Sequence, residues 1–296
     1  MFNWDDLRIF LAAARRRSYQ EAGGHAGLDP TTVGRRIARL ETALRCTLFV
    51  RGPGGLTLTA AGQRLFEAAS GIEGAAETIG ETLGAESGMG VVRISSSEGF
   101  GTSVLAPALP ELARKRPHLA IEMVANPGFY SPVTREVDLA ITLGPPHDAR
   151  LVVERLTEYR LALYAAPAYL KAAGRPETPA DLTAHRLVGY IDDLLFAPEL
   201  RYLDEVHPGL RAGLTSSSIR AQFEIIAAGG GIGILPSFLV ARSASTVVPV
   251  LWDAVRIIRS FWISARRDVQ ETQRVRIIRA WIRDIVKKER GLLLPG

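Results

Sequence analysis

Cysteine and histidine are scarce in this sequence, and their scarcity excludes most disulfide and metal chemistry. Cys46 is the one cysteine in 296 residues, so neither an intramolecular disulfide nor a zinc site of several cysteines can form. The five histidines stand at positions 25, 118, 147, 185 and 207, and no two have the His-x-x-x-His spacing of a ligand pair. We therefore expect no bound metal and no cofactor.

Long hydrophobic runs are also missing. The longest uncharged stretch, Ile225–Ala241, is shorter than the roughly 20 residues that span a bilayer, and a glycine triplet and Pro236 interrupt it. The first dozen residues include charged side chains and contain no apolar core of an export signal. We therefore expect a cytoplasmic protein without a membrane partner.

The length and the distribution of charge indicate several domains. At roughly 100–200 residues per domain, 296 residues correspond to two or three domains. The net charge of +5 is divided unevenly: residues 1–60 carry +4, residues 61–90 carry −4, residues 91–255 carry −2 and residues 256–296 carry +7. A basic head, an acidic connector and a nearly neutral body suggest separate tasks. Arginine supplies almost all the positive charge, which suits phosphate binding but also follows from a GC-rich genome.

The first 58 residues have the pattern of three helices followed by a hairpin. Leu7, Phe10, Leu11 and Ala14 recur at helical spacing, and Ser18, with a glutamate three residues later, begins a second helix. A turn ending in an Asp-Pro pair leads into a third helix, and a Gly-Pro-Gly-Gly turn joins two short apolar runs. This order predicts a winged helix-turn-helix domain.

The exposed face predicted for the third helix carries groups that suit DNA. The first turn of such a helix can enter the major groove and face base edges. Thr31 and Thr32 offer hydroxyl and methyl groups, and Arg35 offers a two-pronged donor for guanine, with Arg36 beside it. Arg51 at the base of the wing can reach a phosphate or the minor groove. A small helical domain with a solvated basic face is the alternative.

A regular apolar stripe follows the hairpin over residues 59–90. Its members are spaced alternately four and three residues apart, as in a coiled coil, and glutamates occupy the other faces. They are Leu65, Ala69, Ile72, Ala76, Ile79 and Leu83. We expect a linker helix that forms a homodimer and presents two heads to a pseudo-palindromic site, although a helix that packs on its own domain would show a similar stripe.

From residue 91 onward, strand and helix patterns alternate. Strands are expected at 91–94, 121–124, 138–141, 159–165, 187–190, 210–214, 232–235 and 257–263, and helices at 106–114, 217–228 and 269–288. Two α/β halves joined by extended crossings predict a two-lobed body whose cleft suits a small molecule. We assign residues 91–160 and 264–296 to lobe I and residues 161–263 to lobe II. The fold class is thus an α/β multidomain protein.

The motifs of the head closely resemble the LysR-type transcriptional regulators. They are Leu7-Arg8-Ile9-Phe10, Ser18-Tyr19, the run from Thr32 to Glu41, Leu48-Phe49-x-Arg51 and Leu58-Thr59-x-Ala61-Gly62. In the body, the run from Ile232 to Pro236 resembles the glycine-rich strand entry of the family. The resemblance covers essentially the whole chain. It implies a DNA-binding dimer or tetramer whose two-lobed, periplasmic-binding-protein-like domain senses a small molecule.

The resemblance also implies which residues contact DNA. Carried over position by position, the contacts are Pro30, Thr31, Thr32, Gly34, Arg35 and Arg51. Gly34 departs from the family, which often has a serine there. Gly23 and Gly24 stand where helix formers are usual, at roughly 1 kcal/mol each, and Arg45 replaces a common helix-ending glycine.

Candidate effector contacts follow the predicted strand ends and helix starts. They are Ser96, Ser97, Glu98, Asn126, Thr142, Ser216 and Ser217. Hydroxyl and backbone N–H groups at a helix start suit a carboxylate or a sugar, and simple helix capping is the alternative for each residue. Because Glu98 would repel a small dianion, we expect a neutral polyhydroxylated ligand or an amine, and not a dicarboxylate.

These observations favour a sequence-specific transcriptional regulator controlled by a small-molecule effector, with RNA polymerase as a further partner if it activates. No nucleophile elbow, Walker loop or acid/base set is present, so no catalytic residue is assigned and no enzyme is expected. The rival is a two-lobed binding protein or enzyme with a helical appendage. Such a protein would bind ligand without a salt-dependent affinity for DNA.

Overall fold

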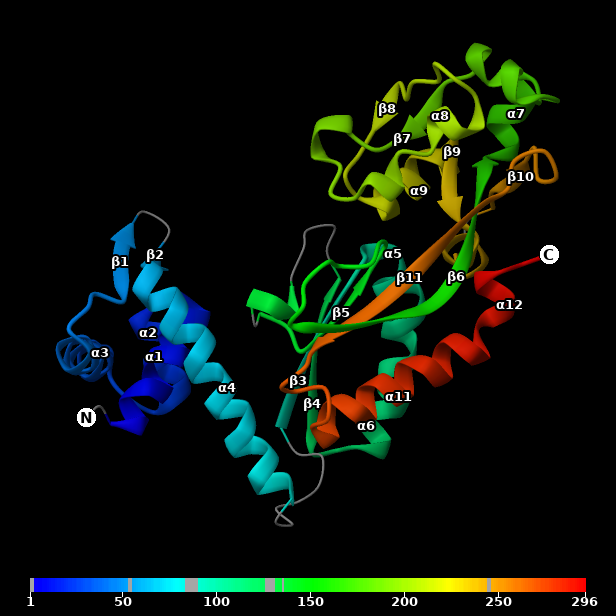
Figure 1. The fold of residues 1–296 in the computed structure, drawn as a ribbon. Coiled ribbons are helices and arrows are strands. Elements are labelled where there is room, and N and C mark those ends of the chain that lie inside the picture. Colours follow the sequence, from blue (N-terminus) through cyan, green and yellow to red (C-terminus); the bar gives the residue numbers. More distant parts are fainter. Residues whose placement is uncertain (1–2, 53–54, 83–89, 126–130, 135, 244–245) are drawn as a thin grey trace. The chain divides into compact units, whose positions relative to one another are not determined.

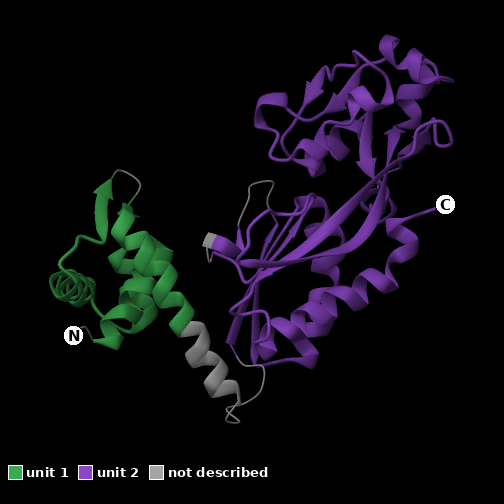
Figure 2. Cartoon of the chain, in the orientation of Figure 1, with its two compact units in different colours: residues 1–86 green, residues 87–296 purple. Residues whose placement is uncertain are grey.

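The computed structural model describes residues 3–52, 55–82, 90–125, 131–134, 136–243 and 246–296, and side chains in these ranges except at positions 73–82 and 134. The chain divides into two compact units, residues 1–86 and residues 87–296 (Figure 2). Each unit has a hydrophobic core of its own. The two units are therefore described separately.

Unit 1 has the order helix, helix, helix, hairpin and long helix. Its elements are α1 (Trp4–Arg16), α2 (Tyr19–Ala26), α3 (Pro30–Leu44), β1 (Phe49–Gly52), β2 (Gly55–Leu58) and α4 (Ala60–Thr82) (Figure 1). The three short helices pack on one another around fully buried Phe10, Ile37 and Leu40. This is the winged helix-turn-helix arrangement that the sequence predicts.

Side-chain caps determine where the helices of unit 1 begin. Ser18 Oγ accepts a hydrogen bond from the Glu21 N–H at 3.3 Å, as the capping pattern predicts. Thr59 Oγ1 accepts one from the Gly62 N–H at 2.9 Å and starts α4. At the other ends, α1 and α3 stop at Arg17 and Arg45, which both have positive φ. Arg45 thus has the left-handed backbone conformation that a helix-ending glycine usually adopts, which agrees with its position at the predicted end of the helix.

The glycine at position 23 is required by the turn between α2 and α3. A Cβ atom there would lie 2.5 Å from the Leu28 carbonyl oxygen, because the chain folds back over α2. At Gly24 a Cβ atom would meet nothing within 4 Å. The two glycines that the sequence groups as equal departures therefore have different roles: Gly23 allows a close approach, and Gly24 lowers helix propensity.

The wing is fixed to the rest of unit 1 by two contacts. Strands β1 and β2 pair antiparallel, with Arg51 opposite Leu56. The Leu56 N–H donates to the Arg17 carbonyl at 2.8 Å, which ties β2 to the end of α1. Glu41 Oε1 accepts from the Leu48 N–H at 2.6 Å, which ties the entry of β1 to α3. The wing therefore holds Arg51 in a defined position relative to α3.

Unit 2 is built on one continuous mixed sheet. Its strands are β3 (Gly90–Ser96), β4 (Leu119–Ala125), β5 (Leu139–Thr142), β6 (Leu151–Ala165), β7 (Leu187–Gly189), β8 (Leu214–Thr215), β9 (Ile232–Pro236), β10 (Val248–Val250) and β11 (Ile257–Arg266). The order is β4-β3-β5-β11-β6-β9-β7-β8, with β10 paired to β6. The long antiparallel strands β6 and β11 run through the sheet from one half to the other (Figure 1).

The two halves of this sheet form two lobes. We use lobe I for β3, β4, β5 and the helices α5 (Glu98–Phe100), α6 (Leu109–Lys115) and α11 (Gln273–Lys288), and lobe II for β7, β8, β9, β10 and the helices α7 (Pro167–Ala173), α8 (Leu203–Val206) and α9 (Ile219–Ala227). A π-helical turn (Gly101–Leu105) and a 3-10 turn (Ala106–Ala108) join α5 to α6. Other 3-10 turns lie at Pro132–Thr134, Pro179–Ala184, Asp192–Leu194 and Pro198–Leu200, and α10 (Ser237–Ala241) and α12 (Arg290–Leu293) complete the set.

The observed elements agree with most of the expected ones, with one clear error. The strand expected at 210–214 is wrong: pairing is confined to Leu214 and Thr215, and the apolar Leu210 is buried in irregular chain instead. A buried residue in a loop and one in a strand look alike in a short apolar run. The basic helix α11 packs on β3 with Val275, Ile278 and Ile282 fully buried. No helix in the described part of the chain is long and apolar enough to cross a membrane.

Candidate nucleic-acid interface and ligand cavity

The first turn of α3 is closed by the carboxylate of Asp29. Asp29 Oδ1 accepts from the Thr32 N–H at 2.8 Å, and the Thr32 hydroxyl donates to Oδ2 at 2.6 Å. The Thr31 hydroxyl donates to the same carboxylate. These donors hold the pKa of Asp29 well below its usual value. Both hydroxyl protons are thus used within the cap, which leaves the methyl groups and oxygen lone pairs for an outside partner.

Arg35 and Arg36 follow each other on α3 but have different surroundings. Arg35 is exposed, and its guanidinium has no hydrogen-bond or ion-pair partner among the residues that the structure describes. Arg36 is half-buried and pairs with the carboxylate of Asp5 on α1. This pair lowers the pKa of Asp5, chiefly through the hydrogen bond from Arg36. The positive charge of Arg35 is therefore open to solvent, whereas that of Arg36 is neutralised within the head.

A second pair also links α1 and α3. The guanidinium of Arg39 donates to both carboxylate oxygens of Asp6, with Nε at 2.6 Å from Oδ2. The Asp6 side chain is 1% exposed. Because a bidentate guanidinium fixes both position and angle, this pair sets how α3 lies against α1.

Arg51 of the wing lies over an aromatic ring beside α3. Its guanidinium carbon is 5.4 Å from the centre of the Tyr19 ring. The same ring lies next to Gly34, where an added Cβ atom would make an ordinary contact of 3.7 Å. The side of α3 at Gly34 therefore has room for the serine that the family often has. Tyr19 connects the base of the wing to α3.

The apolar stripe of α4 is divided between two environments. Ala69 is buried in the core of unit 1, and Leu65 packs against that core. Ile72 is 50% exposed. The side chains of Ala76 and Ile79, and the whole of Leu83, lie outside the described residues. The first part of the stripe thus packs on its own domain, and an exposed apolar residue begins only at Ile72.

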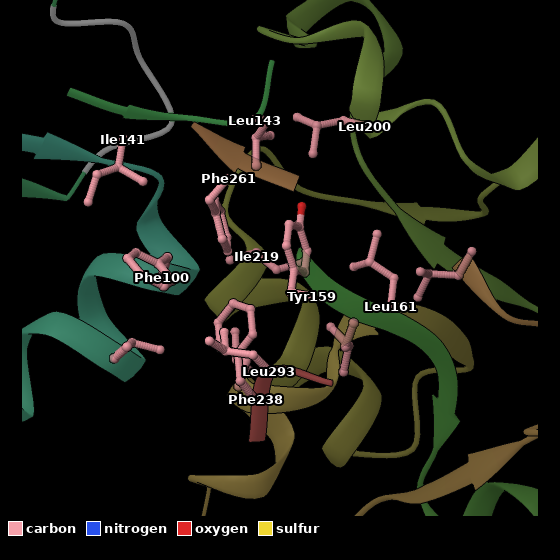
Figure 3. Close-up of a cluster of buried hydrophobic side chains, with 14 of the residues drawn as sticks. Phe100, Ile141, Leu143, Tyr159, Leu161, Leu200, Ile219, Phe238, Phe261 and Leu293 are labelled. Carbon is pink, nitrogen blue, oxygen red and sulfur yellow. The ribbon is translucent and has the colours of Figure 1, made fainter. Parts of the chain in front are cut away.

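A cavity lies in unit 2 where the two lobes meet. Its empty volume, which includes space open to solvent, is about 470 Å³. Its lining residues are mostly aromatic or aliphatic: Ser97, Glu98, Gly99, Phe100, Leu143, Tyr159, Leu161, Tyr190, Phe196, Leu200, Tyr202, Ser217, Ile219, Pro236, Phe238 and Phe261. Figure 3 shows Tyr159 among Phe100, Phe238 and Phe261. The rings of Tyr159 and Phe261 stack with centroids 4.2 Å apart.

Three of the predicted effector contacts line this cavity, namely Ser97, Glu98 and Ser217. The other predicted positions differ. Ser96 is buried in β3 and donates to the Ser97 carbonyl at 3.1 Å. Thr142 donates to the Gly144 carbonyl at 2.7 Å, Ser216 Oγ accepts from the Ser218 N–H at 3.2 Å, and neither lines the cavity. Asn126 lies outside the described residues. The side chains of Ser96, Thr142 and Ser216 thus bond to nearby backbone groups.

Glu98 connects the lobes across the cavity. It follows β3 in lobe I, and its Oε1 accepts from the Ser218 hydroxyl at 2.8 Å in lobe II. Its Oε2 accepts from the Ile219 N–H at 2.9 Å. Ser218 is also the N-cap of α9, where its Oγ accepts from the Ala221 N–H at 3.1 Å. The carboxylate thus occupies the positive end of the α9 dipole.

The sequence reasoning missed the aromatic side of the cavity. Tyr159, Tyr190 and Tyr202 all line it, and the hydroxyls of all three lack a hydrogen-bond partner among the described residues. Burial raises the pKa of each of these hydroxyls. These tyrosines sit in a long strand and in irregular chain, far apart in sequence. Among the aromatic residues of the described lining, only Phe100 lies within two positions of a predicted contact, Glu98.

No group of three or more potential metal ligands occurs within the ranges for which the structure gives coordinates. Cys46 is partly exposed and packs against the core of unit 1. The polar groups of the cavity include one carboxylate, which is already bonded, and several hydroxyls. The cavity is therefore equipped to bind a small molecule by shape and hydrogen bonds.

Two family models match the chain. The model described as "Bacterial regulatory helix-turn-helix protein, lysR family" matches residues 4–63. The model described as "LysR substrate binding domain" matches residues 85–287, which is more than half of the chain. The first covers the helices and the wing of unit 1, and the second covers the two lobes.

Curated proteins and solved structures are similar to this chain. The Mau operon transcriptional activator of Paracoccus denitrificans is 28% identical over 286 residues, 96% of each chain. The transcriptional regulator DmlR of Escherichia coli is 34% identical over 186 residues, 61% of this chain and 59% of DmlR. A full-length variant of OxyR from Pseudomonas aeruginosa has a TM-score of 0.77 at 18% identity, covering 97% of this chain and 95% of its own. LysG from Corynebacterium glutamicum, solved with its effector arginine, has a TM-score of 0.66 at 19% identity, covering 97% and 99%. These structures share the fold.

Proposed function

The chain belongs to the LysR family of transcriptional regulators, and from this premise we propose how its parts divide the work. Residues 1–58 bind operator DNA, residues 59–90 join two subunits, and residues 91–296 bind a small-molecule effector between lobe I and lobe II. The protein regulates transcription in the cytoplasm, where the chromosome lies, and catalyses no reaction. Its relatives act as regulators and activators of transcription, which supports this assignment.

The assignment of DNA binding to residues 1–58 rests on the exposure of Arg35 and on its lack of an acidic partner among the described residues. This arginine lies on the helix that follows the helix-turn-helix turn. We assign Arg35 to a guanine edge in the major groove, and Thr31 and Thr32 to thymine methyl groups or to donors on the bases. Pro30 and Gly34 bring the backbone of α3 close to the DNA, and Arg51 binds a phosphate beside them. Because Arg36 is paired with Asp5, we assign it to the α1–α3 contact and only secondarily to phosphate.

The dimer contact is proposed for the later part of the linker stripe. Ile72 is half exposed on α4, whereas Leu65 and Ala69 pack on their own domain. An exposed isoleucine on a heptad position favours pairing with a second copy of the helix. Two heads held in this way would bind a pseudo-palindromic operator, and RNA polymerase would be a further partner if the protein activates.

Control by the effector requires that the lobes and the DNA-binding heads be coupled. Glu98 of lobe I already bonds the start of α9 in lobe II, so a ligand in the cavity changes the contact between the lobes. We propose that this change alters how the paired heads bind DNA. By linkage, effector and DNA would then change each other's affinity by the same factor, typically about 5- to 150-fold.

The DNA-binding part is tested by fluorescence anisotropy on the DNA upstream of the protein's own gene, with scrambled DNA of the same length as a reference. Arg35→Ala should weaken operator binding by about 1–3 kcal/mol and reduce the preference over scrambled DNA. Arg51→Ala should weaken both DNAs and lower the salt dependence. The control is Arg201→Ala, which removes an exposed arginine of lobe II. Equal binding of both DNAs by the wild type would refute the function.

The dimer contact is tested separately by sedimentation velocity of Ile72→Glu. Loss of the dimer in this variant, with the fold of unit 1 retained by circular dichroism, is the expected result. The matched control is Ile121→Glu, because Ile121 is a partly buried isoleucine of lobe I and belongs to a different unit from α4. A dimer that persists in Ile72→Glu rules out this position as part of the contact.

A further inference from the structure

The walls of the cavity between the lobes determine what kind of molecule it can hold. Among the lining residues that the structure describes, none is a lysine, arginine or histidine. The aromatic rings of Phe100, Tyr159, Phe238 and Phe261 form one packed group along it. Aromatic walls favour a planar ring, which fits edge-to-face or offset against them. They cannot satisfy a molecule that carries many hydroxyl groups, because each unpaired hydroxyl would be costly.

The position that would attract an anion is already filled. In a two-lobed cavity of this kind, the free N–H groups at the start of α9 are the natural place for a carboxylate. Here the carboxylate of Glu98 accepts from the Ile219 N–H at 2.9 Å and from the Ser218 hydroxyl at 2.8 Å. A ligand carboxylate would meet this negative charge, and no cation in the described part of the lining offsets it. An amine would have to share a carboxylate whose two oxygens are both bonded.

In the described lining, the buried polar groups that lack hydrogen-bond partners are phenol hydroxyls, whereas the hydroxyls of Ser97 and Ser217 are partly exposed. The Tyr202 hydroxyl is buried, and its side chain is 2% exposed. The Tyr159 side chain is 3% exposed, and Figure 3 shows its hydroxyl oxygen directed toward Leu143 and Leu200, two other lining residues. A buried hydroxyl without a partner is unfavourable, so it gains from a ligand oxygen that accepts its proton.

We propose that this cavity binds an uncharged aromatic molecule that carries a carbonyl, ester or ether oxygen. The ring packs among Phe100, Phe238 and Phe261, and the oxygen accepts a hydrogen bond from Tyr202 or Tyr159. This inference rests on the proposed function, because it names the class of effector for the same cavity. It differs from the polyhydroxylated ligand or amine that the sequence suggested, since the missed tyrosines and phenylalanines change the chemistry of the site.

The test uses pairs of probes that differ mainly in charge, measured on the full chain by thermal shift and isothermal titration calorimetry. Methyl benzoate and benzoate form one pair, acetophenone and phenylethylammonium a second, and glucose represents polyols. The neutral member of each pair should bind at least about tenfold more tightly than its charged counterpart, and glucose should not bind. Tighter binding of benzoate, of the ammonium ion or of glucose overturns the proposal, and so does the absence of binding by both neutral probes.

A conservative variant tests the role of the phenol. Tyr202→Phe keeps the ring and removes a hydroxyl that has no partner, so the variant should fold as well as the wild type. Methyl benzoate should bind about tenfold more weakly to it, while toluene, which has no oxygen, should bind equally to both proteins. The control is Tyr169→Phe, because the Tyr169 hydroxyl is bonded to the Arg186 N–H at 3.0 Å and Tyr169 does not line the cavity. Unchanged affinity for methyl benzoate in Tyr202→Phe and Tyr159→Phe overturns the hydrogen-bond assignment.

Failure of this inference and failure of the proposed function are distinguishable. If the wild type binds its upstream DNA specifically but no neutral aromatic probe, the inference fails and the regulatory function stands. If the probes bind as expected but the protein shows no preference for that DNA, the proposed regulatory function fails and the ligand class stands.

Discussion

The carboxylate of Glu98 and the hydroxyl of Ser218 join the two lobes of the effector-binding unit at 2.8 Å. Glu98 follows β3, the first strand of lobe I, and Ser218 is the N-cap of α9 in lobe II. The same carboxylate accepts from the Ile219 N–H, so it adds a second cap to α9. A residue that the sequence indicates as a ligand contact is thus also a structural connection between the lobes.

The connection through Glu98 should be measurable as stability. In Glu98→Gln the amide keeps the shape of the side chain, but it loses the negative charge at the α9 N-terminus and presents a donor in place of one acceptor. We expect the unfolding free energy of the effector-binding unit to fall by about 1–2 kcal/mol. Hydrogen exchange at the first turn of α9 should rise. The control is Glu111→Gln, which removes an exposed pair with Lys115 within lobe I. If Glu111→Gln lowers the unfolding free energy as much as Glu98→Gln does, the contact of Glu98 between the lobes does not stabilise the unit more than an exposed ion pair does.

Substituting alanine at the two glycines of α2, Gly23 and Gly24, should change the stability of unit 1 in opposite directions. Gly23→Ala would bring a methyl group to 2.5 Å from the Leu28 carbonyl oxygen, and the turn before α3 would have to move. We expect unit 1 to lose about 1–3 kcal/mol. Gly24→Ala meets nothing within 4 Å and should gain about 0.5–1 kcal/mol from helix propensity. Hydrogen exchange of α2 and α3 measures both changes. Equal effects in the two variants would mean that the close approach at Gly23 relaxes without cost.

The link between α1 and α3 predicts a difference between two neighbouring aspartates. The Asp6 side chain is 1% exposed and accepts hydrogen bonds from Nε and Nη2 of Arg39, whereas the Asp5 side chain is 44% exposed. Asp6→Asn should therefore destabilise unit 1 by about 1–3 kcal/mol, and Asp5→Asn by less than about 1 kcal/mol. Chemical unfolding followed by hydrogen exchange in α3 separates the two. A larger loss in Asp5→Asn would show that Arg36, and not Arg39, fixes the angle of α3.

The sequence was sufficient for the head because its signals are local. Ser18, Thr59 and the Asp-Pro pair before α3 mark helix starts within a few residues, and the structure has a cap at each. Three structural roles of residues in unit 1 could not be predicted from the sequence. The engagement of the Thr31 and Thr32 hydroxyls by Asp29, and the pairing of Arg36 with Asp5, depend on how side chains turn in space. The need for glycine at position 23 depends on the path of the chain after α2.

The cavity was only partly predictable because its residues come from distant segments. Ser97, Glu98 and Ser217 stand at strand ends and helix starts, which local patterns reveal. Tyr159 lies inside the long strand β6, and Tyr202 precedes the short helix α8. A tyrosine in a strand is usually part of a core, and only the three-dimensional fold brings these two to one cavity. The residues that make the cavity aromatic were therefore missed.

The cap of α3 gives a prediction about acid. In the folded state three hydrogen bonds lower the pKa of Asp29 below its value near 3.9 in an unfolded chain. A carboxylate with a depressed folded-state pKa adds stability that is fully present above the unfolded pKa, and this stability is lost as pH falls below about 4 toward the folded pKa. Asp29→Asn keeps an oxygen that can cap the helix but cannot titrate. The stability of α3 in this variant should thus vary less between pH 5 and pH 3 than in the wild type, as measured by the exchange of its amide hydrogens. The same dependence in both proteins would assign the acid sensitivity of α3 to another group, such as Asp5 beside Arg36.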